Sequence, residues 1–381
     1  MSIPLSLYIH LPWCVRKCPY CDFNSYTSGD TAPRARYLRA LISDIRNEAV
    51  RADGRALVSV FLGGGTPSLF TPTEIDELLN AVAAHFTLAS DIEITMEANP
   101  GTVECGDPDG YRQAGVNRLS IGAQSFSPES LQLLGRIHSV DDISRSVEAA
   151  NSAGFDSINL DLMYGLPRQR VENALSDIES ALQLGPQHIS WYQLTLEPNT
   201  VFHTRPPAGL PDEERLFDIQ SHGQDLLADN GFDQYEVSAW SRDGFRCRHN
   251  LNYWSFGDYL AVGAGAHGKF TDTSGACRYA KPANPLAYMQ AIETEDPVPL
   301  PPPLGDAELL FEFMLNALRL HDGFDAALFE ERTGLSSECL ADAARPALQR
   351  GLIDTRELAY WRPTALGRQF LNDLQAEFLP G

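Results

Sequence analysis

The stretch "LVSVFLGGGTPSLFTPTEIDELLNAVAAHFTLASDIEITMEANP", residues 57–100, decides the fold. The apolar run from Leu57 to Gly64 predicts a buried strand, and residues 71–86 carry apolar side chains at helical spacing after a Thr-Pro start. Residues 92–100 then alternate between apolar and polar side chains, as a strand does. A strand, a helix and a strand in this order predict a parallel pair joined by a right-handed crossover.

The same alternation continues on both sides of this stretch. Further segments with strand character are residues 5–12, 117–124, 157–167 and 188–198. Helical periodicity separates most of them, for example over residues 33–52 and 139–154. Strands that alternate with helices predict an α/β fold with a parallel sheet.

Several predicted strands place polar side chains on one face. The polar residues that share a face within their strands are Tyr8 and His10, then Glu93, Thr95, Glu97 and Asn99, then Arg118, Ser120 and Gln124, then Asn159 and Asp161. Either the sheet is antiparallel with one face in water, or it is a barrel whose interior is a ligand cavity. The intervening helices favour the barrel.

Composition limits the kind of partner. A chain of 381 residues with 43% hydrophobic residues can bury a large core. Its formal net charge of -22 repels polyanions, so we expect no nucleic acid partner. The sequence shows neither a transmembrane segment nor the basic region and cleavage site of a secretory signal, which predicts a cytoplasmic protein.

The chain divides by composition into four predicted parts. Residues 1–198 form the barrel core, and residues 199–296 form an extension with a helix near 211–231 and a short strand at 234–240. A proline-rich linker, "PVPLPPPLG", spans 297–305. Residues 306–381 follow as helices, a hairpin and a final helix at 365–379, which predicts a winged-helix-like module. Its acidic balance argues against DNA binding.

The cysteines Cys14, Cys18 and Cys21 have the spacing CxxxCxxC. Seven cysteines, an odd number, in a reducing compartment argue against a disulfide framework and favour a metal or cluster site. Structural zinc commonly needs a second cysteine pair, which is absent, although a catalytic zinc with three thiolates stays open. A cubane iron-sulfur cluster held by three thiolates would leave one iron for a chelating small molecule.

A glycine-rich turn, "GGGTPS", follows the second predicted strand at Gly63–Ser68. Glycine lets the backbone approach a ligand closely. In a barrel of parallel strands, sites gather at the carboxyl ends of the strands. The residues expected at that end, besides the cysteines and glycines, are Glu97, Gln124, Asp161 and Thr195.

The motifs "YIHLPWC" with CxxxCxxC, "GGGTPS", "EITMEANP", "NRLSIGAQSF", "LLGRIHS" and "DLMYGLPRQ" together resemble the radical S-adenosylmethionine (SAM) superfamily and its coproporphyrinogen dehydrogenase-like branch. The resemblance spans nearly the whole chain. It implies an α/β fold, a partial TIM barrel of parallel strands with a C-terminal α+β winged-helix-like module. It also implies chemistry in which SAM is reduced to methionine and a 5'-deoxyadenosyl radical.

The resemblance also implies roles for single residues. Cys14, Cys18 and Cys21 would bind a 4Fe-4S cluster. The residues expected to contact the SAM on that cluster are Tyr8, Gly64, Gly65, Thr66 and Glu97. The residues that match positions of a second SAM site are Tyr20, Gln124, Arg136, Asp161 and Thr195. At the position of Thr195, other members of the branch carry alanine. Arg136 as a surface cation and Gln124 as a core amide remain alternatives.

The chain differs from coproporphyrinogen dehydrogenases in two ways. Those enzymes carry a fourth cysteine at the position where this chain has Phe23. They also have a longer segment before the cluster, whereas only 13 residues precede Cys14 here. Both departures resemble the HemW group, heme chaperones that bind heme and pass it to acceptor proteins, which could include membrane-bound respiratory enzymes. A dehydrogenase, or another radical SAM enzyme acting on a tetrapyrrole, is the alternative.

A second motif resembles the same group. The segment "RCRHNLNYW", residues 246–254, contains HNxxYW, which implies heme binding through His249, with Cys247 as an alternative ligand. Imidazole can ligate heme iron, and guanidinium groups can pair with heme propionates. Arg242, Arg246 and Arg248 form a basic island here, and an ordinary packed loop is the competing interpretation.

Overall fold

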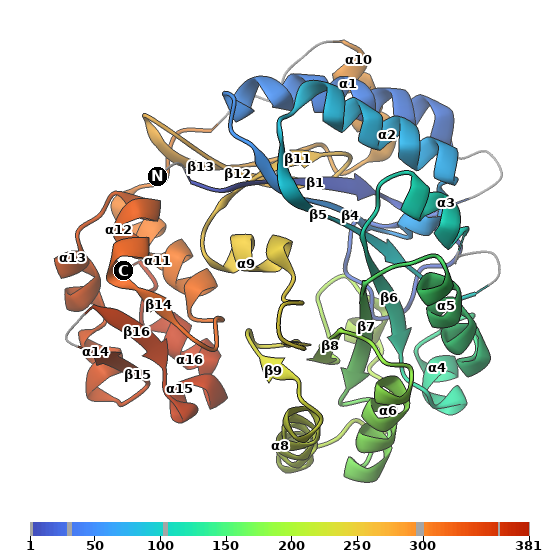
Figure 1. Cartoon of the computed structure of the whole chain (residues 1–381). Helices are drawn as coiled ribbons and strands as arrows, with labels where there is room; N and C mark the ends of the chain where they lie inside the picture. The colour runs from blue at the N-terminus through green and yellow to red at the C-terminus, as the bar shows by residue number, and fades with distance from the viewer. Residues whose placement is uncertain (1–2, 29–32, 102–105, 295–300, 357–358, 381) are drawn as a thin grey trace.

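The computed structural model describes residues 3–28, 33–101, 106–294, 301–356 and 359–380. Within them, an 11-stranded sheet curves into a partial barrel, with most helices on its outer face (Figure 1). Its strands are β1 (Leu5–Leu11), β4 (Leu57–Gly64), β5 (Leu88–Ala98), β6 (Arg118–Gln124), β7 (Ser157–Tyr164), β8 (His188–Gln193), β9 (Asp233–Gln234), β10 (Ala239–Ser241), β11 (Asp258–Val262), β12 (His267–Asp272) and β13 (Gly275–Ala280).

The strand order is β13-β12-β11-β1-β4-β5-β6-β7-β8-β10-β9. Strands β1 and β4 to β8 are parallel neighbours in chain order, so the predicted α/β barrel is confirmed. The polar faces point inward, since Thr95, Gln124 and Asn159 are buried. Strand β8 ends at Gln193, earlier than predicted, because its partner β7 ends at Tyr164, which is paired with Gln193.

The helices around the sheet begin at strong start signals. Helix α2 starts with Pro72 behind a capping box of Thr71 and Glu74, and buries the apolar face led by Ile75 and Leu78. The helices of this part are α1 (Arg34–Ala52), α2 (Pro72–His85), α3 (Pro108–Gln113), α4 (Pro128–Leu133), α5 (Val140–Ser152), α6 (Val171–Gln183), α7 (Val201–Thr204), α8 (Glu213–Asp229), α9 (Arg248–Trp254) and α10 (Pro285–Glu293), with a 3-10 turn at Pro67–Leu69. No helix in the described ranges is long and apolar enough to cross a membrane.

The extension contains more regular structure than predicted. Strand β11 adds to the free edge of β1 in parallel, and β12 and β13 form a hairpin beside it. The single strand predicted at 234–240 is wrong. The chain reverses between β9 and β10, because the amide of Ala239 donates to the carbonyl of Glu236.

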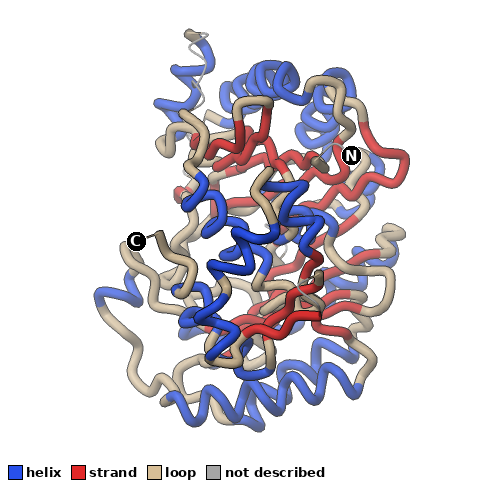
Figure 2. Tube along the Cα trace, turned by 90° about the vertical axis from the view of Figure 1, so that its left-hand side faces the viewer, coloured by secondary structure: helices blue, strands red, loops and turns tan. Residues whose placement is uncertain are grey.

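The C-terminal elements form a separate group beside α9 in Figure 1, and Figure 2 views the molecule from the side on which this group lies. They are α11 (Asp306–Ala317), β14 (Phe324–Asp325), α12 (Ala326–Thr333), α13 (Ser337–Ala343), α14 (Arg345–Gln349), β15 (Ile353–Arg356), β16 (Tyr360–Pro363), α15 (Ala365–Gln369) and α16 (Leu371–Ala376). The predicted final helix is broken at Phe370, whose backbone leaves the helical region.

Trp361 and Phe313 lie in the core of this C-terminal group, which also includes Phe256 from the extension. Residues 297–300 of the predicted linker lie outside the described residues. The predicted division into four parts therefore stays a prediction.

A buried cluster of ion pairs joins the β12–β13 hairpin to α1. The ammonium of Lys281, just after β13, lies 2.7 Å from Asp44 Oδ1 and 2.8 Å from Glu48 Oε1. The hydroxyls of Tyr288 and Tyr279 donate to the same two carboxylates. Arg51 lies 3.4 Å from Glu48 as well, so two cations face the two carboxylates, and the sheet edge is held against the helix that covers it.

We predict that Lys281→Met lowers the free energy of unfolding by about 3–5 kcal/mol, because it removes the cation beside buried Asp44 and one of the two cations beside Glu48, the other being Arg51. Arg36→Met removes the exposed ion pair with Glu293 and should cost less than about 1 kcal/mol. Urea unfolding of the full chain measures both. Equal effects of the two substitutions would contradict the buried cluster.

Candidate functional site

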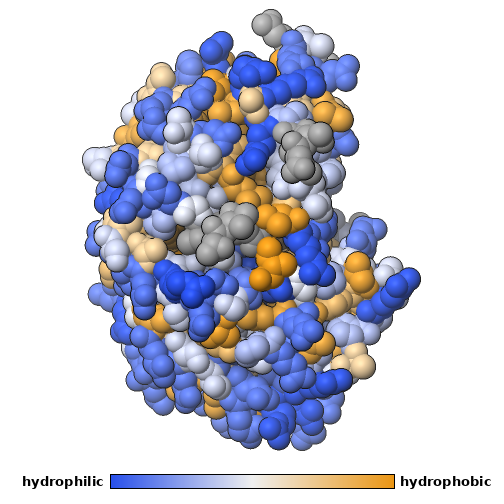
Figure 3. Space-filling model, turned by 90° about the vertical axis from the view of Figure 1, so that its right-hand side faces the viewer, coloured by the Kyte–Doolittle hydropathy of each residue, from blue (hydrophilic) through white to orange (hydrophobic). Residues whose placement is uncertain are grey.

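A pocket lies at the carboxyl ends of β1 and β4 to β7. Figure 3 views the molecule from the side toward which β1 points in Figure 1, and shows hydrophobic residues gathered near the middle of a mostly hydrophilic face. The predicted site residues that line the pocket are Cys14, Cys18, Tyr20, Cys21, Gly64, Gly65, Thr66, Glu97, Gln124, Arg136 and Asp161. The structure therefore brings most of the predicted site together.

The cysteines lie on one loop that closes on itself. Cys14 ends β2 (Trp13–Cys14), which pairs with β3 (Tyr26–Thr27) in parallel. Between them, the amide of Cys21 donates to the carbonyl of Cys18 at 3.2 Å in a tight turn. None of the three cysteines forms a disulfide, and all three line the same pocket.

The glycine turn is shaped by packing against this loop. A Cβ on Gly64, whose φ is +118°, would lie 2.4 Å from the His10 ring, and a Cβ on Gly65 would lie 2.6 Å from the carbonyl of Trp13. The amides of Gly65 and Thr66 donate to the carbonyls of Leu11 and Trp13. Glycine is required here because the end of β4 lies directly against the cysteine loop.

Two carboxyl groups, those of Glu97 and Asp161, line the pocket. Burial, and then the charge of Asp161, raise the pKa of Glu97 to about 7. Burial also raises the pKa of Asp161, although hydrogen bonds from Asn159 and Ser120 oppose the shift. A pair of partly desolvated carboxyls favours a cationic ligand, which would relieve their repulsion.

Arg136 and Gln124 both point into the pocket. Arg136 donates to Asn99 Oδ1 at 2.7 Å and lies 3.8 Å from the sulfur of Cys18, so it is not a surface cation. The Gln124 amide oxygen accepts from the hydroxyl of Tyr192 at 2.8 Å rather than from the backbone. The surface-cation alternative for Arg136 is therefore wrong, whereas Gln124 is a buried amide whose oxygen is satisfied by a side chain.

Asn99 and Tyr192 line the pocket but were not among the residues predicted to contact a ligand. Asn99, on the polar face of β5, joins Arg136 to the Thr66 hydroxyl, and Tyr192 lines the pocket from β8. Alternation along β8 places Tyr192 on the same face as His188 and could have revealed it.

Two of the residues predicted to contact SAM, Tyr8 and Thr195, lie outside this pocket. Thr195 is exposed, beyond the end of β8. Tyr8 lies behind the pocket in the barrel interior, where its hydroxyl is 3.0 Å from Nδ1 of His10. The other ring nitrogen of His10 bonds the carbonyl of Asn24 in the cysteine loop. His10 thus connects Tyr8 to that loop.

His249 lies near the opposite end of the barrel. Its Nδ1 is 3.0 Å from the hydroxyl of Ser59, and its ring centroid is 5.0 Å from that of Phe61. Ser59 precedes Gly64 by five residues on β4, about 16 Å along a strand. His249 is buried, and burial lowers its pKa to about 4, which leaves the imidazole neutral.

The rest of the HNxxYW segment packs around α9. Asn252 donates to the hydroxyl of Ser6 and to the carbonyl of Asp258, which fixes α9 against β1 and β11. Arg319 of the C-terminal group covers the ring of Trp254 at 4.2 Å. These contacts join α9 to the barrel and to the C-terminal group.

The predicted basic island is largely neutralised by the protein itself. Arg246 pairs with Asp322, and Arg248 pairs with Asp91. Arg242 lies over the ring of Phe232 instead. The arginines of this segment therefore have partners within the chain.

The pocket fits a cluster better than a single ion. Among the described residues, no three His, Cys, Asp or Glu side chains converge to bind one metal ion. A cubane spreads its ligands, because each thiolate binds a different iron. Three cysteine side chains around one pocket, beside two carboxyls that favour a cation, fit a 4Fe-4S cluster and the sulfonium and ammonium groups of SAM.

The barrel and the pocket define a radical SAM protein. Residues 8–178 match the family model of the Radical SAM superfamily, and residues 304–370 match that of the HemN C-terminal domain. The fold is similar to that of coproporphyrinogen III oxidase (HemN) from Escherichia coli, a radical SAM enzyme, with a TM-score of 0.83 and 25% identity over 99% of this chain and 90% of that one. Membership of the superfamily implies a 4Fe-4S cluster and SAM as cofactors.

Relatives that match nearly the whole chain show to which family of radical SAM proteins it belongs. Heme chaperone HemW from Escherichia coli (strain K12) is 46% identical over 99% of this chain and 98% of its own. The Haemophilus influenzae heme chaperone HemW is 45% identical over the same shares, and that of Mycobacterium tuberculosis (strain H37Rv) is 36% identical over 92% and 89%. The chain belongs to the HemW family.

We predict that Glu97→Gln stabilises the cofactor-free chain at high pH. The folded-state pKa of Glu97, about 7, exceeds the ordinary value of 4.5, so the parent loses stability as the pH rises through this window and has lost it fully above 7. The gain at pH 8 should be about 2 kcal/mol, below the full linkage value because the side chain faces an open pocket.

Urea unfolding at pH 4 and pH 8 tests this prediction. Glu77→Gln, on the exposed face of α2, serves as the control and should leave stability nearly unchanged at both. A Glu97→Gln gain that is the same at both pH values would show that the carboxyl does not titrate as described.

We also predict that Cys18→Ser abolishes iron-sulfur assembly and spares the fold, because it removes a thiolate from an open loop rather than from the core. Visible absorbance after anaerobic reconstitution reports the cluster, and thermal unfolding reports the fold. Cys339→Ser, at an exposed cysteine of the C-terminal group, is the matched control and should keep the absorbance. Loss of folding in Cys18→Ser would instead indicate a structural cysteine.

Proposed function

We propose that the protein is a heme chaperone that holds a SAM-ligated 4Fe-4S cluster, binds heme and transfers it to acceptor proteins. The full-length similarity to proteins named heme chaperone HemW carries this proposal. The acceptors would be heme proteins, which could include membrane-bound respiratory enzymes. The expected place of action is the cytoplasm.

In this proposal the pocket holds the cluster and SAM. Cys14, Cys18 and Cys21 would ligate three irons, and Glu97 would contact a cationic group of SAM. When bound, this assembly supplies one-electron reduction of the sulfonium. Backbone groups of Gly64, Gly65 and Thr66 would meet the methionine end. Arg136 would help to balance the negative charge of the cluster, since it lies beside Cys18.

A second SAM is proposed deeper in the same pocket. Tyr20 lines the pocket from the cysteine loop, Gln124 and Asp161 line it from β6 and β7, and Tyr192 adds a hydroxyl there. Thr195, which is exposed beyond β8, would join this site only if the segment after β8 folded inward. Tyr8 would act from behind the pocket, through the barrel interior.

Heme ligation by His249 remains a prediction, with Cys247 as its alternative. A neutral imidazole can bind heme iron, but this ring is buried between Ser59, Phe61 and Tyr8. Burial raises the pKa of the Cys247 thiol to about 12, which disfavours the thiolate. Ligation at either residue would require α9 to move away from the barrel.

Coproporphyrinogen dehydrogenase activity is the second candidate function. The similarity to coproporphyrinogen III oxidase (HemN) favours it. Phe23, which stands where such dehydrogenases carry a fourth cysteine, is 61% exposed at the edge of the pocket and cannot ligate iron. This difference in the cysteine loop favours the chaperone.

We predict that the reconstituted protein binds heme and leaves coproporphyrinogen III unchanged in the presence of SAM and a reductant. Heme titration followed by absorbance, and chromatography of the porphyrin and 5'-deoxyadenosine products, measure the two activities. The Cys18→Ser variant separates cluster-dependent from cluster-independent heme binding. Stoichiometric protoporphyrinogen formation would reverse the proposal in favour of the dehydrogenase.

A further inference from the structure

A series of buried hydrogen bonds runs through the barrel interior next to the cysteine pocket. Asp161 and Ser120 line that pocket, whereas Asn159, His188 and Tyr235 do not. The last three side chains are at most 1% exposed and come from β7, from β8 and from the segment after β9. Because bulk water does not reach them, their polar atoms depend on one another for hydrogen bonds.

The series begins at Asp161. The amide nitrogen of Asn159 lies 2.7 Å from Asp161 Oδ1, and the amide oxygen of Asn159 lies 2.6 Å from Nδ1 of His188. Nε2 of His188 lies 2.8 Å from the hydroxyl of Tyr235. The oxygen of Tyr235 accepts in turn from the backbone amide of Cys247 at 3.3 Å. The hydrogen bonds therefore extend from the pocket to the residue that precedes α9.

The direction of each hydrogen bond follows from the donors and acceptors. An ionised carboxylate only accepts, so the side chain of Asn159 turns its NH2 group toward Asp161 and its oxygen toward His188. Nδ1 of His188 must then carry the ring proton. Burial, and then the charge of Arg118, lower the pKa of His188, so the ring is neutral and Nε2 accepts from Tyr235. The other tautomer, or the other amide orientation, would place two acceptors against each other.

Two hydroxyl groups complete the surroundings of Asn159 and Asp161. The hydroxyl of Ser120 accepts from Asn159 at 2.7 Å and donates to Asp161 Oδ2 at 3.2 Å. The hydroxyl of Ser190 donates to the amide oxygen of Asn159 at 3.1 Å. Since a carboxylate can accept about four hydrogen bonds, these donors orient Asp161 and leave lone pairs for a ligand in the pocket.

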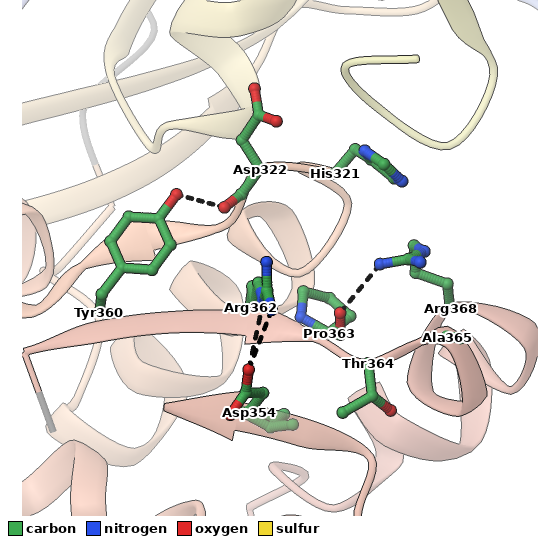
Figure 4. Close-up of a pocket in the computed structure, with 10 residues that line it drawn as sticks. His321, Asp322, Asp354, Tyr360, Arg362, Pro363, Thr364, Ala365 and Arg368 are labelled. Atoms are coloured by element: carbon green, nitrogen blue, oxygen red, sulfur yellow. Dashed lines mark hydrogen bonds and ion pairs between the residues drawn. The ribbon is translucent and has the colours of Figure 1, made fainter. Parts of the chain in front are cut away.

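The surface hollow over β15, β16 and α15 is built differently (Figure 4). Its polar side chains form separate contacts, such as Arg362 with Asp354 at 3.1 Å and the hydroxyl of Tyr360 with the carbonyl of Asp322. The Arg362 and Asp354 side chains are exposed, so water can replace their contact at little cost. Around His188, water cannot do so, and the loss of one hydrogen bond changes the orientation of the next group.

We propose that His188 is a positioning residue for the SAM pocket. It holds the amide of Asn159 in the orientation in which Asp161 presents a fixed carboxylate to a cationic group of SAM. Tyr235 keeps the proton of His188 on Nδ1, because its hydroxyl donates to Nε2. Both residues act through Asp161, since neither lines the pocket. This inference rests on the proposed function, because it takes Asp161 as a contact of SAM.

SAM binding to the cluster-loaded full chain tests the inference. His188→Leu removes the donor to Asn159, which lets the amide turn its oxygen toward Asp161, and should weaken SAM binding about tenfold. His188→Asn keeps an N–H group near the position of Nδ1 and should restore most of the affinity. Anaerobic equilibrium dialysis with radiolabelled SAM measures both variants, and urea unfolding checks that each is folded.

Tyr235→Phe is a milder test, because it keeps the ring and removes only the hydroxyl. It should weaken SAM binding about threefold, and it gives a result even if His188→Leu folds poorly. Tyr279→Phe is the matched control. The hydroxyl of Tyr279 likewise donates to a side chain, that of Glu48, and accepts from a backbone amide, that of Ala261, but Tyr279 does not line the pocket. This control should bind SAM as the parent does.

A double-mutant cycle separates positioning from general support of the fold. If His188 acts through Asp161, adding His188→Leu to Asp161→Asn should weaken SAM binding by less than about twofold more. A further loss as large as that in the parent would show that His188 acts elsewhere and would overturn the inference. Parent-like binding in both His188→Leu and Tyr235→Phe would overturn it as well.

Failure of the proposed function gives a different result. A parent chain that binds no SAM would contradict the proposed pocket, and this inference would fail with it. A parent chain that binds SAM but no heme would contradict the chaperone proposal and leave the role of His188 intact. A parent chain that binds both, with unchanged SAM binding in the variants, would contradict this inference alone.

Discussion

The register of β1 against β4 is the constraint on which the site depends. Parallel pairing sets Leu11 opposite Gly64, so the cysteine loop after β1 and the glycine turn after β4 leave the sheet at the same level. The backbone bonds from Gly65 and Thr66 to this loop then follow. A shift of one residue would turn the polar faces out of the barrel and separate the thiols from Glu97.

The pocket is electrostatically unfavourable without its ligands. Glu97 and Asp161 lose water and repel each other, and both pKa values rise. The charge cluster of Lys281, Asp44 and Glu48 behaves differently, because its cation is built into the fold. The ion pairs of Lys281 thus stabilise the fold at the sheet edge. The carboxyls of Glu97 and Asp161 in the pocket would instead be neutralised by a cationic cofactor.

The two ends of the barrel carry different groups of residues. The carboxyl ends of the strands carry the thiols and the paired carboxyls, as expected for parallel barrels. Near the other end, α9 closes the interior with His249 and ties the C-terminal group to the barrel through Trp254 and Arg319.

The sequence by itself determined the alternation of strands and helices, the inward polar faces and the cysteine loop, because these depend on short periodic patterns and fixed spacing. Only the tertiary structure decided which side chains meet. The bonds of Tyr192 to Gln124 and of His249 to Ser59 join residues far apart in the chain. The break of the last helix at Phe370 likewise depends on packing between segments, which no local pattern encodes.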